Sequence, residues 1–215
     1  MTRNTRTLTT PLGDARVTTD VPDGQTNGVA LLFHGAGGDS GAAALLAVRD
    51  ALLDAGWRVA RLDQPYVVAG RRVPAPAPRL DEVALLAVAR VRQEGVPLLL
   101  AGKSSGARVG CRIATAAGAA GVVALGFPLH PPGRPEKSRA PELNAAGVPV
   151  LVLQGTRDTF GGPDDVRAVA GRHVTVHEVA GGDHSFRARK ADGRPTRDLL
   201  TEVAAEAARF AQALT

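Results

Sequence analysis

The 215-residue chain is poor in cysteine and in long apolar runs, and each shortage excludes a class of protein. Cys111 is its single cysteine, so it can form neither an internal disulfide nor a cysteine zinc cluster. No apolar run approaches the ~18 residues of a membrane-spanning helix. The polar segment 1–10 also lacks the apolar stretch of a signal peptide. These absences predict a cytoplasmic protein with no membrane partner.

Aromatic residues are also scarce, at 3% of the chain, which is too few for the base-stacking surfaces of nucleic-acid-binding proteins. The formal net charge is +5, but the arginines that carry most of it are scattered rather than gathered in a stripe or tail. A composition biased toward arginine and alanine explains this charge without a polyanionic partner. We therefore expect no nucleic-acid partner.

The length and composition are typical of one globular domain. Hydrophobic residues make up 44% and charged residues 22% of the chain. A chain of this size buries roughly 70% of its unfolded surface, enough for a core without disulfides. Neither an internal repeat nor an interdomain linker is evident, so we expect a single domain over residues 1–215.

Strand-like and helix-like segments alternate along the chain. Two β-favouring segments, 6–10 and 16–21, flank a Pro–Gly turn and predict an antiparallel hairpin. Further strands are expected at residues 29–33, 59–62, 97–101, 122–125, 148–153 and 174–179, and helices at 45–52, 80–91, 105–117 and 199–214. This alternation predicts an α/β protein with a mostly parallel, doubly wound sheet and the hairpin at one edge.

Two glycine-rich segments are candidates for nucleotide binding. The tripeptide Gly102-Lys-Ser matches the end of a P-loop, but the first glycine of that loop would fall at Pro97, which excludes it. The segment 35–40 is similar to a dinucleotide-binding fingerprint, except that Ser40 stands in place of the third glycine. Asp63 lies roughly where a ribose-binding acid would be, so dinucleotide binding stays as an alternative.

The motif that fits its context is G-x-S-x-G, spelled Gly102-Lys-Ser104-Ser-Gly106. It lies between the expected strand 97–101 and the expected helix 105–117. A serine at the centre of this motif stands on a sharp strand-to-helix turn, and the two glycines allow the strand and the helix to approach closely. Ser104 is therefore the predicted nucleophile.

A nucleophile on such a turn needs donors for the oxyanion that forms on the substrate. The backbone N–H of Ser105 follows the nucleophile directly, and the N–H of Ala36 comes from the first strand–helix loop. Both are expected to form the oxyanion hole, with His34 bracing the loop that carries Ala36.

A serine hydroxyl also needs a histidine as base and a carboxylate that orients the histidine. Asp158 and His184 follow the last two expected strands, in the chain order of α/β-hydrolases. They are the predicted acid and base, with Asp165 and Asp183 as less well placed acids.

Loops after the strands are expected to border the nucleophile, because ligands bind at the carboxyl ends of parallel strands. Tyr66 would supply an aromatic wall and a hydroxyl group. His130 lies in a proline-rich segment at 127–135 that limits its movement. Arg72, in the segment 70–79, would favour an anionic acyl group, unless it is simply a solvated surface cation.

Six segments of the chain resemble those of the small α/β-hydrolases grouped with the KANSL3 and testis-expressed-30 proteins, near dienelactone-hydrolase-like enzymes. The segments that carry the resemblance are His34-Gly-Ala-Gly-Gly-Asp39, Pro65-Tyr66, Gly102-Lys-Ser-Ser-Gly-Ala-Arg108, Phe127-Pro-Leu-His-Pro-Pro-Gly133, Gln154-Gly-Thr-Arg-Asp158 and Gly182-Asp-His-Ser-Phe186. The chain departs from the family at Ser105, where methionine is usual, and at Ala107, where glycine is usual.

The resemblance implies an α/β-hydrolase fold with Ser104, Asp158 and His184 as a catalytic triad. The length leaves no room for a large lid domain. We expect a serine hydrolase that cleaves a small carboxylic ester or thioester through an acyl-enzyme, with no cofactor and no metal. The alternative is a non-catalytic member that uses the fold as an interaction surface.

Overall fold

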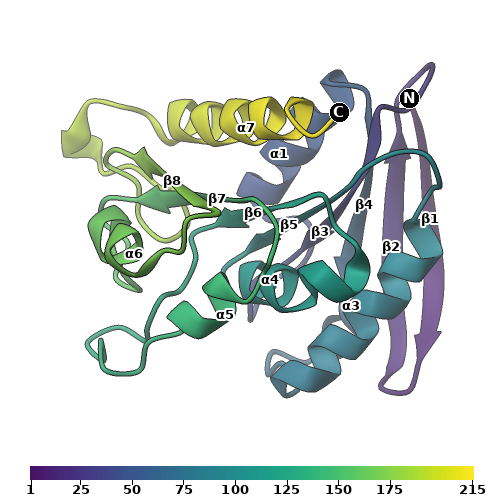
Figure 1. Cartoon of the computed structure of the whole chain (residues 1–215), viewed down its shortest axis with the longest axis horizontal. Helices are drawn as coiled ribbons and strands as arrows, with labels where there is room; N and C mark the ends of the chain where they lie inside the picture. The colour runs from purple at the N-terminus through teal and green to yellow at the C-terminus, as the bar shows by residue number, and fades with distance from the viewer.

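A computed structural model describes residues 1–215, apart from the side chain of residue 192. Its centre is one eight-stranded sheet in the order β1-β2-β4-β3-β5-β6-β7-β8 (Figure 1). The strands are β1 (Thr2–Thr10), β2 (Gly13–Val21), β3 (Gly28–Phe33), β4 (Trp57–Asp63), β5 (Leu98–Lys103), β6 (Gly121–Leu125), β7 (Val150–Gly155) and β8 (Val174–Val179). The helices are α1 (Ala43–Asp54), α2 (Pro65–Val68), α3 (Ala77–Val91), α4 (Ser105–Ala117), α5 (Ala140–Asn144), α6 (Pro163–Val169) and α7 (Thr196–Gln212), with a 3₁₀ turn η1 at Lys190–Asp192.

The sheet is parallel from β4 across to β8, and antiparallel only where the N-terminal hairpin joins it. β2 pairs antiparallel with β1 on one side and with β4 on the other. The remaining strands pair parallel with their neighbours. The predicted α/β fold with an antiparallel hairpin at one edge is therefore confirmed.

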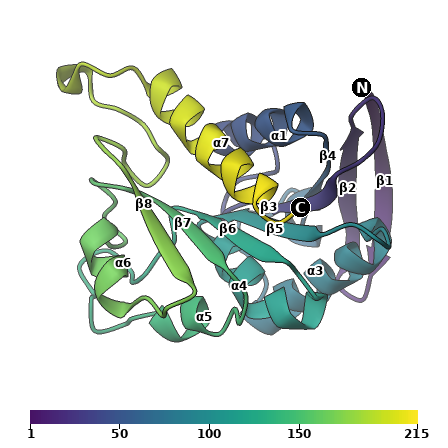
Figure 2. The same ribbon diagram turned by 45° about the horizontal axis from the view of Figure 1, so that its top comes forward.

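The apolar strands in the middle of the sheet bury both of their faces, which explains their continuous hydrophobic sequences. Leu31 and Leu100 point into the core beneath α3 and α4, whereas Leu32 and Leu99 point into the core beneath α1 and α7. Figure 2 shows the α1 and α7 pair on one side of the sheet and α3, α4 and α5 on the other. Helices thus cover both faces.

The structure adds three short helices that the sequence did not predict. α2, α5 and α6 contain four, five and seven residues, too few for a helical hydrophobic period to be recognised. Each has a proline in its first turn, a position that proline favours because the missing N–H would be unpaired there.

Besides the helices α1, α3, α4 and α7 that cover the sheet, the connections at the carboxyl ends of the described strands carry only the three short helices and the 3₁₀ turn η1, with no lid domain. Among the described residues, no helix is long and apolar enough to cross a membrane. Because β3, β5, β7 and β8 run parallel, the loops that follow them meet at one edge of the sheet. This edge carries the predicted nucleophile, acid and base.

Candidate active site

Ser104 occupies the turn between β5 and α4 in a backbone conformation that residues with a side chain rarely adopt. Its φ is 53° and its ψ is −114°. The surroundings enforce this conformation: the Ser104 N–H donates to the Leu125 carbonyl at 3.0 Å, and the Ser104 carbonyl accepts from the Ala107 N–H at 3.0 Å. Such strain persists where packing overdetermines it, and it concentrates at functional sites.

The two glycines of the motif are a steric requirement of this turn. A Cβ atom on Gly102 would fall on the backbone of Gly106, well inside the 3.0 Å that real Cβ atoms keep. A Cβ atom on Gly106 would in turn fall on the carbonyl oxygen of Phe33. β5, α4 and β3 therefore approach one another as closely as backbones can.

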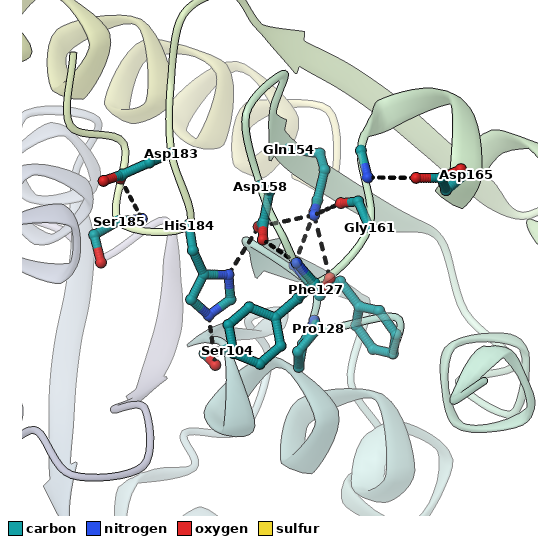
Figure 3. A network of polar contacts seen from close by, with 12 residues as sticks. Ser104, Phe127, Pro128, Gln154, Asp158, Gly161, Asp165, Asp183, His184 and Ser185 are labelled. Atoms are coloured by element: carbon teal, nitrogen blue, oxygen red, sulfur yellow. Dashed lines mark hydrogen bonds and ion pairs between the residues drawn. The ribbon is translucent and has the colours of Figure 1, made fainter. Parts of the chain in front are cut away.

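His184 joins Ser104 to Asp158 in one hydrogen-bonded chain (Figure 3). Its Nε2 lies 2.9 Å from Ser104 Oγ, and its Nδ1 lies 2.8 Å from Asp158 Oδ2. The Asp158 side chain is fully buried, whereas the imidazole is 19% exposed. A carboxylate at Nδ1 selects the tautomer that leaves Nε2 free to accept the serine proton.

The carboxylate of Asp158 is hydrogen-bonded through both of its oxygens. Oδ1 accepts from the Phe160 N–H at 2.9 Å, and Oδ2 accepts from Gln154 Nε2 at 3.0 Å as well as from His184. These donors compensate for the burial of a charged group. The ring of Phe160 packs on the imidazole of His184 with centroids 4.3 Å apart.

The loops that carry Asp158 and His184 pack directly against each other. A Cβ atom on Gly155, at the end of β7, would fall on the carbonyl group of Gly182. Phe186 anchors the His184 loop from the other side: it is fully buried, with a φ of 58°. Close backbone packing thus fixes the distance between the two loops.

The two alternative acids, Asp183 and Asp165, accept hydrogen bonds from backbone N–H groups rather than from His184. Asp183 Oδ1 accepts from the N–H groups of Ser185 and Arg187, at 2.7 and 2.8 Å, and so shapes the loop around the histidine. Asp165 Oδ2 accepts from the Gly162 N–H at 2.8 Å, at the start of α6. Neither carboxylate has a hydrogen bond to His184 in the described part of the chain.

Two backbone N–H groups near Ser104 lack a partner among the described residues. Ser105 is the first residue of α4, and N–H groups in the first turn of a helix have no intrahelical acceptor. The Ala36 N–H, in the loop after β3, donates to no backbone or side-chain group that is described. This loop passes beside Ser104, because a Cβ atom on Gly35 would lie 3.4 Å from Ser104 Cβ.

His34 holds this loop in place. Its Nδ1 donates to the Gly35 carbonyl at 2.8 Å, and its Nε2 accepts from the Gln64 N–H at 3.1 Å. Burial lowers the pKa of His34, and a neutral imidazole is the form that can accept the Gln64 bond.

The structure places Tyr66 beside this brace. Tyr66 lies in α2, 9% exposed, with its ring edge-on to His34 at a centroid distance of 5.7 Å. Burial raises the pKa of its hydroxyl. Tyr66 lines a cavity of about 460 Å³, called here the Tyr66 groove, together with Leu12, Pro65, Val68, Arg71 and Leu80. A crevice of about 10 Å³ shares Tyr66 with this groove and reaches Ser105.

His130 and Arg72 differ in their distance from the hydrogen-bonded chain. The His130 N–H donates to the Phe160 carbonyl at 3.0 Å, which places it next to the residue that packs on His184. Arg72 is exposed and has no hydrogen bond or ion pair among the described residues. The structure therefore brings His130 to the site and leaves Arg72 on the surface.

The dinucleotide alternative has no support in this geometry. Asp63 is 6% exposed, and its Oδ1 accepts from the Ser40 N–H at 2.8 Å, so the carboxylate holds the loop after β3. It is not open to a ribose. Among the described residues, no group of three or more His, Cys, Asp or Glu side chains could hold a metal ion.

The sequence did not reveal the roles of Gln154 and Phe160. Gln154 donates a hydrogen bond to Asp158, and the ring of Phe160 packs on His184. The signal for Gln154 was an amide side chain at the end of the otherwise apolar strand β7. Phe160 gave no such signal, because its contact with His184 joins two loops that are distant in sequence.

The chain matches the family model described as "Alpha/beta hydrolase domain" over residues 26–212, and it belongs to that family. No curated protein sequence matches it.

Solved structures with the same fold include XC6422 from Xanthomonas campestris, described as an α/β serine hydrolase without lid (22% identity, 97% of this chain and 94% of that chain, TM-score 0.74). An α/β serine hydrolase homologue from Coxiella burnetii is 20% identical over 96% of this chain and 98% of that chain, with a TM-score of 0.76. Est1E from Butyrivibrio proteoclasticus is 14% identical over 98% of both chains, with a TM-score of 0.74.

The close packing at the turn predicts that alanine substitutions at two glycines of α4 differ in their effect on the free energy of unfolding. Gly106→Ala should lower the free energy of unfolding by about 3 kcal/mol, because its methyl group overlaps backbone that cannot move away. Gly110→Ala should change it by less than ~1 kcal/mol, since its Cβ would meet Val122 Cγ1 at an ordinary 3.4 Å. Urea unfolding followed by circular dichroism measures both values. Equal losses in the two variants would contradict the close approach at Gly106.

Proposed function

We propose that the protein is a serine hydrolase that cleaves a carboxylic ester or thioester through an acyl-enzyme on Ser104. The observation that carries this proposal is the continuous chain from Ser104 Oγ through His184 to the buried carboxylate of Asp158, on a strained strand-to-helix turn. A base within hydrogen-bond reach of a hydroxyl, itself oriented by an acid, is the arrangement that activates a serine.

In the proposed reaction, Ser104 Oγ attacks the acyl carbonyl carbon while its proton moves to His184 Nε2. Asp158 holds the imidazole and stabilises its protonated form. The N–H groups of Ala36 and Ser105 hold the oxyanion of the tetrahedral intermediate. The imidazolium returns its proton to the departing alcohol or thiol. Water, deprotonated by the same imidazole, then releases the carboxylic acid and regenerates the Ser104 hydroxyl.

The substrate side of the proposal rests on the open site and the Tyr66 groove. No lid domain covers Ser104, so a large apolar chain would have little shelter, and small esters suit the site better. The groove offers mostly apolar walls with the phenol of Tyr66, and His130 borders the opposite side of the histidine. We assign Tyr66 and His130 to substrate contact, and Arg72 to a weak preference for anionic acyl groups at the rim.

The motifs and composition of the sequence support two finer assignments, a subfamily and a cellular location. Within the α/β-hydrolase family, the chain is proposed to group with the KANSL3 and testis-expressed-30 proteins, on the motifs given above. It is further proposed to act in the cytoplasm, as a single domain over residues 1–215, on a small-molecule substrate.

Labelling with a fluorophosphonate probe tests the assignment of the nucleophile, because two serines are adjacent. The adduct should form on Ser104, whose hydroxyl faces His184, and not on Ser105, the first residue of α4. Peptide mapping by mass spectrometry distinguishes the two. Ser104→Ala should lose most ester hydrolysis and keep an acceleration of about 10³-fold over water.

The matched variant Ser105→Ala retains the backbone N–H and should retain labelling. Labelling on Ser105 would disprove the assigned turn. A folded wild-type protein that takes up no probe would favour the non-catalytic alternative.

Kinetics of p-nitrophenyl esters with neutral and carboxylate-bearing acyl groups test the substrate contacts. Tyr66→Ala should lower kcat/KM for both esters by about tenfold, because a buried aromatic wall is lost, whereas Tyr66→Phe isolates the hydroxyl. Arg72→Ala should lower the carboxylate-to-neutral ratio of kcat/KM by only about twofold, since its charge is exposed.

Arg172→Ala is the control for Arg72. Arg172 is also exposed, but it precedes β8 and so lies at the amino ends of the parallel strands, away from Ser104. An equal change in both arginine variants would show an effect of net charge alone. Unchanged kinetics in Tyr66→Ala would place the substrate elsewhere.

A further inference from the structure

We propose that Gln154 is the positioning residue of the acid and the base: its amide fixes the carboxylate of Asp158 and the loop that carries Phe160 against His184. The inference rests on the proposed function, because it assigns a role within the same site. Among the described residues, Gln154 has no hydrogen bond to Ser104 or to the imidazole of His184.

Gln154 is the last side chain of β7 before Gly155, and it is completely buried. Its Oε1 accepts from the Phe127 N–H at 2.9 Å. Its Nε2 lies 2.7 Å from the Gly161 carbonyl, 3.0 Å from Asp158 Oδ2 and 3.2 Å from the Phe127 carbonyl. Figure 3 shows these bonds converging on the one amide.

The amide group of Gln154 is fully used by these contacts. An amide nitrogen has two protons, and the two shortest contacts assign them to Gly161 and Asp158, with the Phe127 carbonyl as a weaker third acceptor. A buried polar group is costly unless its partners are present, so an amide at the end of an apolar strand indicates a site that needs both a donor and an acceptor.

The bond to Asp158 controls the oxygen that faces the histidine. Asp158 Oδ2 accepts from Gln154 Nε2 and from His184 Nδ1, while Oδ1 accepts from the Phe160 N–H. With a donor on each side of Oδ2, the carboxylate cannot rotate away from the imidazole without breaking a charge-assisted bond in a buried environment. A neutral amide provides this donor without adding a charge.

The bonds to Gly161 and Phe127 set the position of the loop that carries Phe160. They join the loop that follows Asp158 to the segment that follows β6. The His130 N–H bond to the Phe160 carbonyl joins the same two segments a second time. The Phe160 ring, held between them, packs on the face of His184. One side chain therefore fixes both the acid at Nδ1 and the ring beneath the imidazole.

The test is Gln154→Met, which keeps the length of the side chain and removes its donors and acceptor. For a p-nitrophenyl ester, kcat should fall about 10- to 100-fold, the effect of one lost hydrogen bond to a charged group, with KM within about twofold. The acidic midpoint of the kcat/KM–pH profile should move down by about half a pH unit, because a carboxylate that is free to rotate away from the imidazole stabilises the imidazolium less.

Val152→Ala is the matched control, because Val152 is a buried residue of the same strand and the same face of the sheet, and its apolar side chain makes no hydrogen bond to Asp158 or to the loops beside it. It should lower Tm and leave the pH midpoint in place. A Gln154→Met variant with wild-type kcat, or with a midpoint that is unmoved or raised, overturns the proposal.

Gln154→Glu tests the inference if the methionine variant does not fold. While protonated, the introduced carboxyl group still has one donor for Asp158. Once ionised, it repels the carboxylate of Asp158 and the nearby carbonyl groups. Activity should therefore disappear as pH rises, at a pH where the wild-type enzyme is active and where circular dichroism still reports a folded variant. An alkaline profile identical to that of the wild type overturns the positioning role.

Proton NMR separates a failure of this inference from a failure of the proposed function. The Nδ1 proton of His184, hydrogen-bonded to Asp158, should give a strongly deshielded resonance without any substrate. It should shift in Gln154→Met and stay in place in Val152→Ala. A shift in a protein that hydrolyses no ester would disprove the proposed function and support the positioning role. An unshifted resonance in Gln154→Met would disprove the positioning role alone.

Discussion

The close approach of β3, β5 and α4 is the constraint on which the rest of the site depends. Only hydrogen atoms fit at Gly102 and Gly106, and between these two glycines the chain turns at Ser104 with a positive φ. The same contact brings the loop after β3 alongside Ser104, next to the first N–H of α4, which has no acceptor within the helix. The positions of the proposed nucleophile and of the two candidate oxyanion donors therefore depend on one backbone packing arrangement.

The second requirement is a buried charge that remains hydrogen-bonded. Asp158 is hydrogen-bonded to Nδ1 of the imidazole with no exposed side-chain surface, and N–H groups of His184, Gln154 and Phe160 surround its carboxylate. A carboxylate held in this way can orient a histidine and stabilise its protonated form during a reaction. The fold supplies the donors because the loops after β6, β7 and β8 pack together at one edge of the sheet.

The sequence predicted the parts of the molecule that local physics determines. The G-x-S-x-G turn, the helix at 105–117 and the strand at 174–179 depend on nearby residues, and the structure has both elements at those bounds. α2, α5 and α6 were missed because they are too short to show a period. Gln154 was missed because its bond to Phe127 spans 27 positions, a contact that only the folded sheet creates. Arg72 was expected near the substrate from its loop alone, and that loop exposes it.

Direct observation of the acyl-enzyme is the most direct test of the account. The protein would be mixed rapidly with p-nitrophenyl acetate, quenched in acid and analysed by intact and peptide mass spectrometry. The account predicts one acetyl group on the peptide that contains Ser104, formed with a burst of p-nitrophenol and lost on longer incubation, and none in Ser104→Ala. Turnover of the ester with no acyl group on this peptide, or an equal adduct in Ser104→Ala, would contradict it.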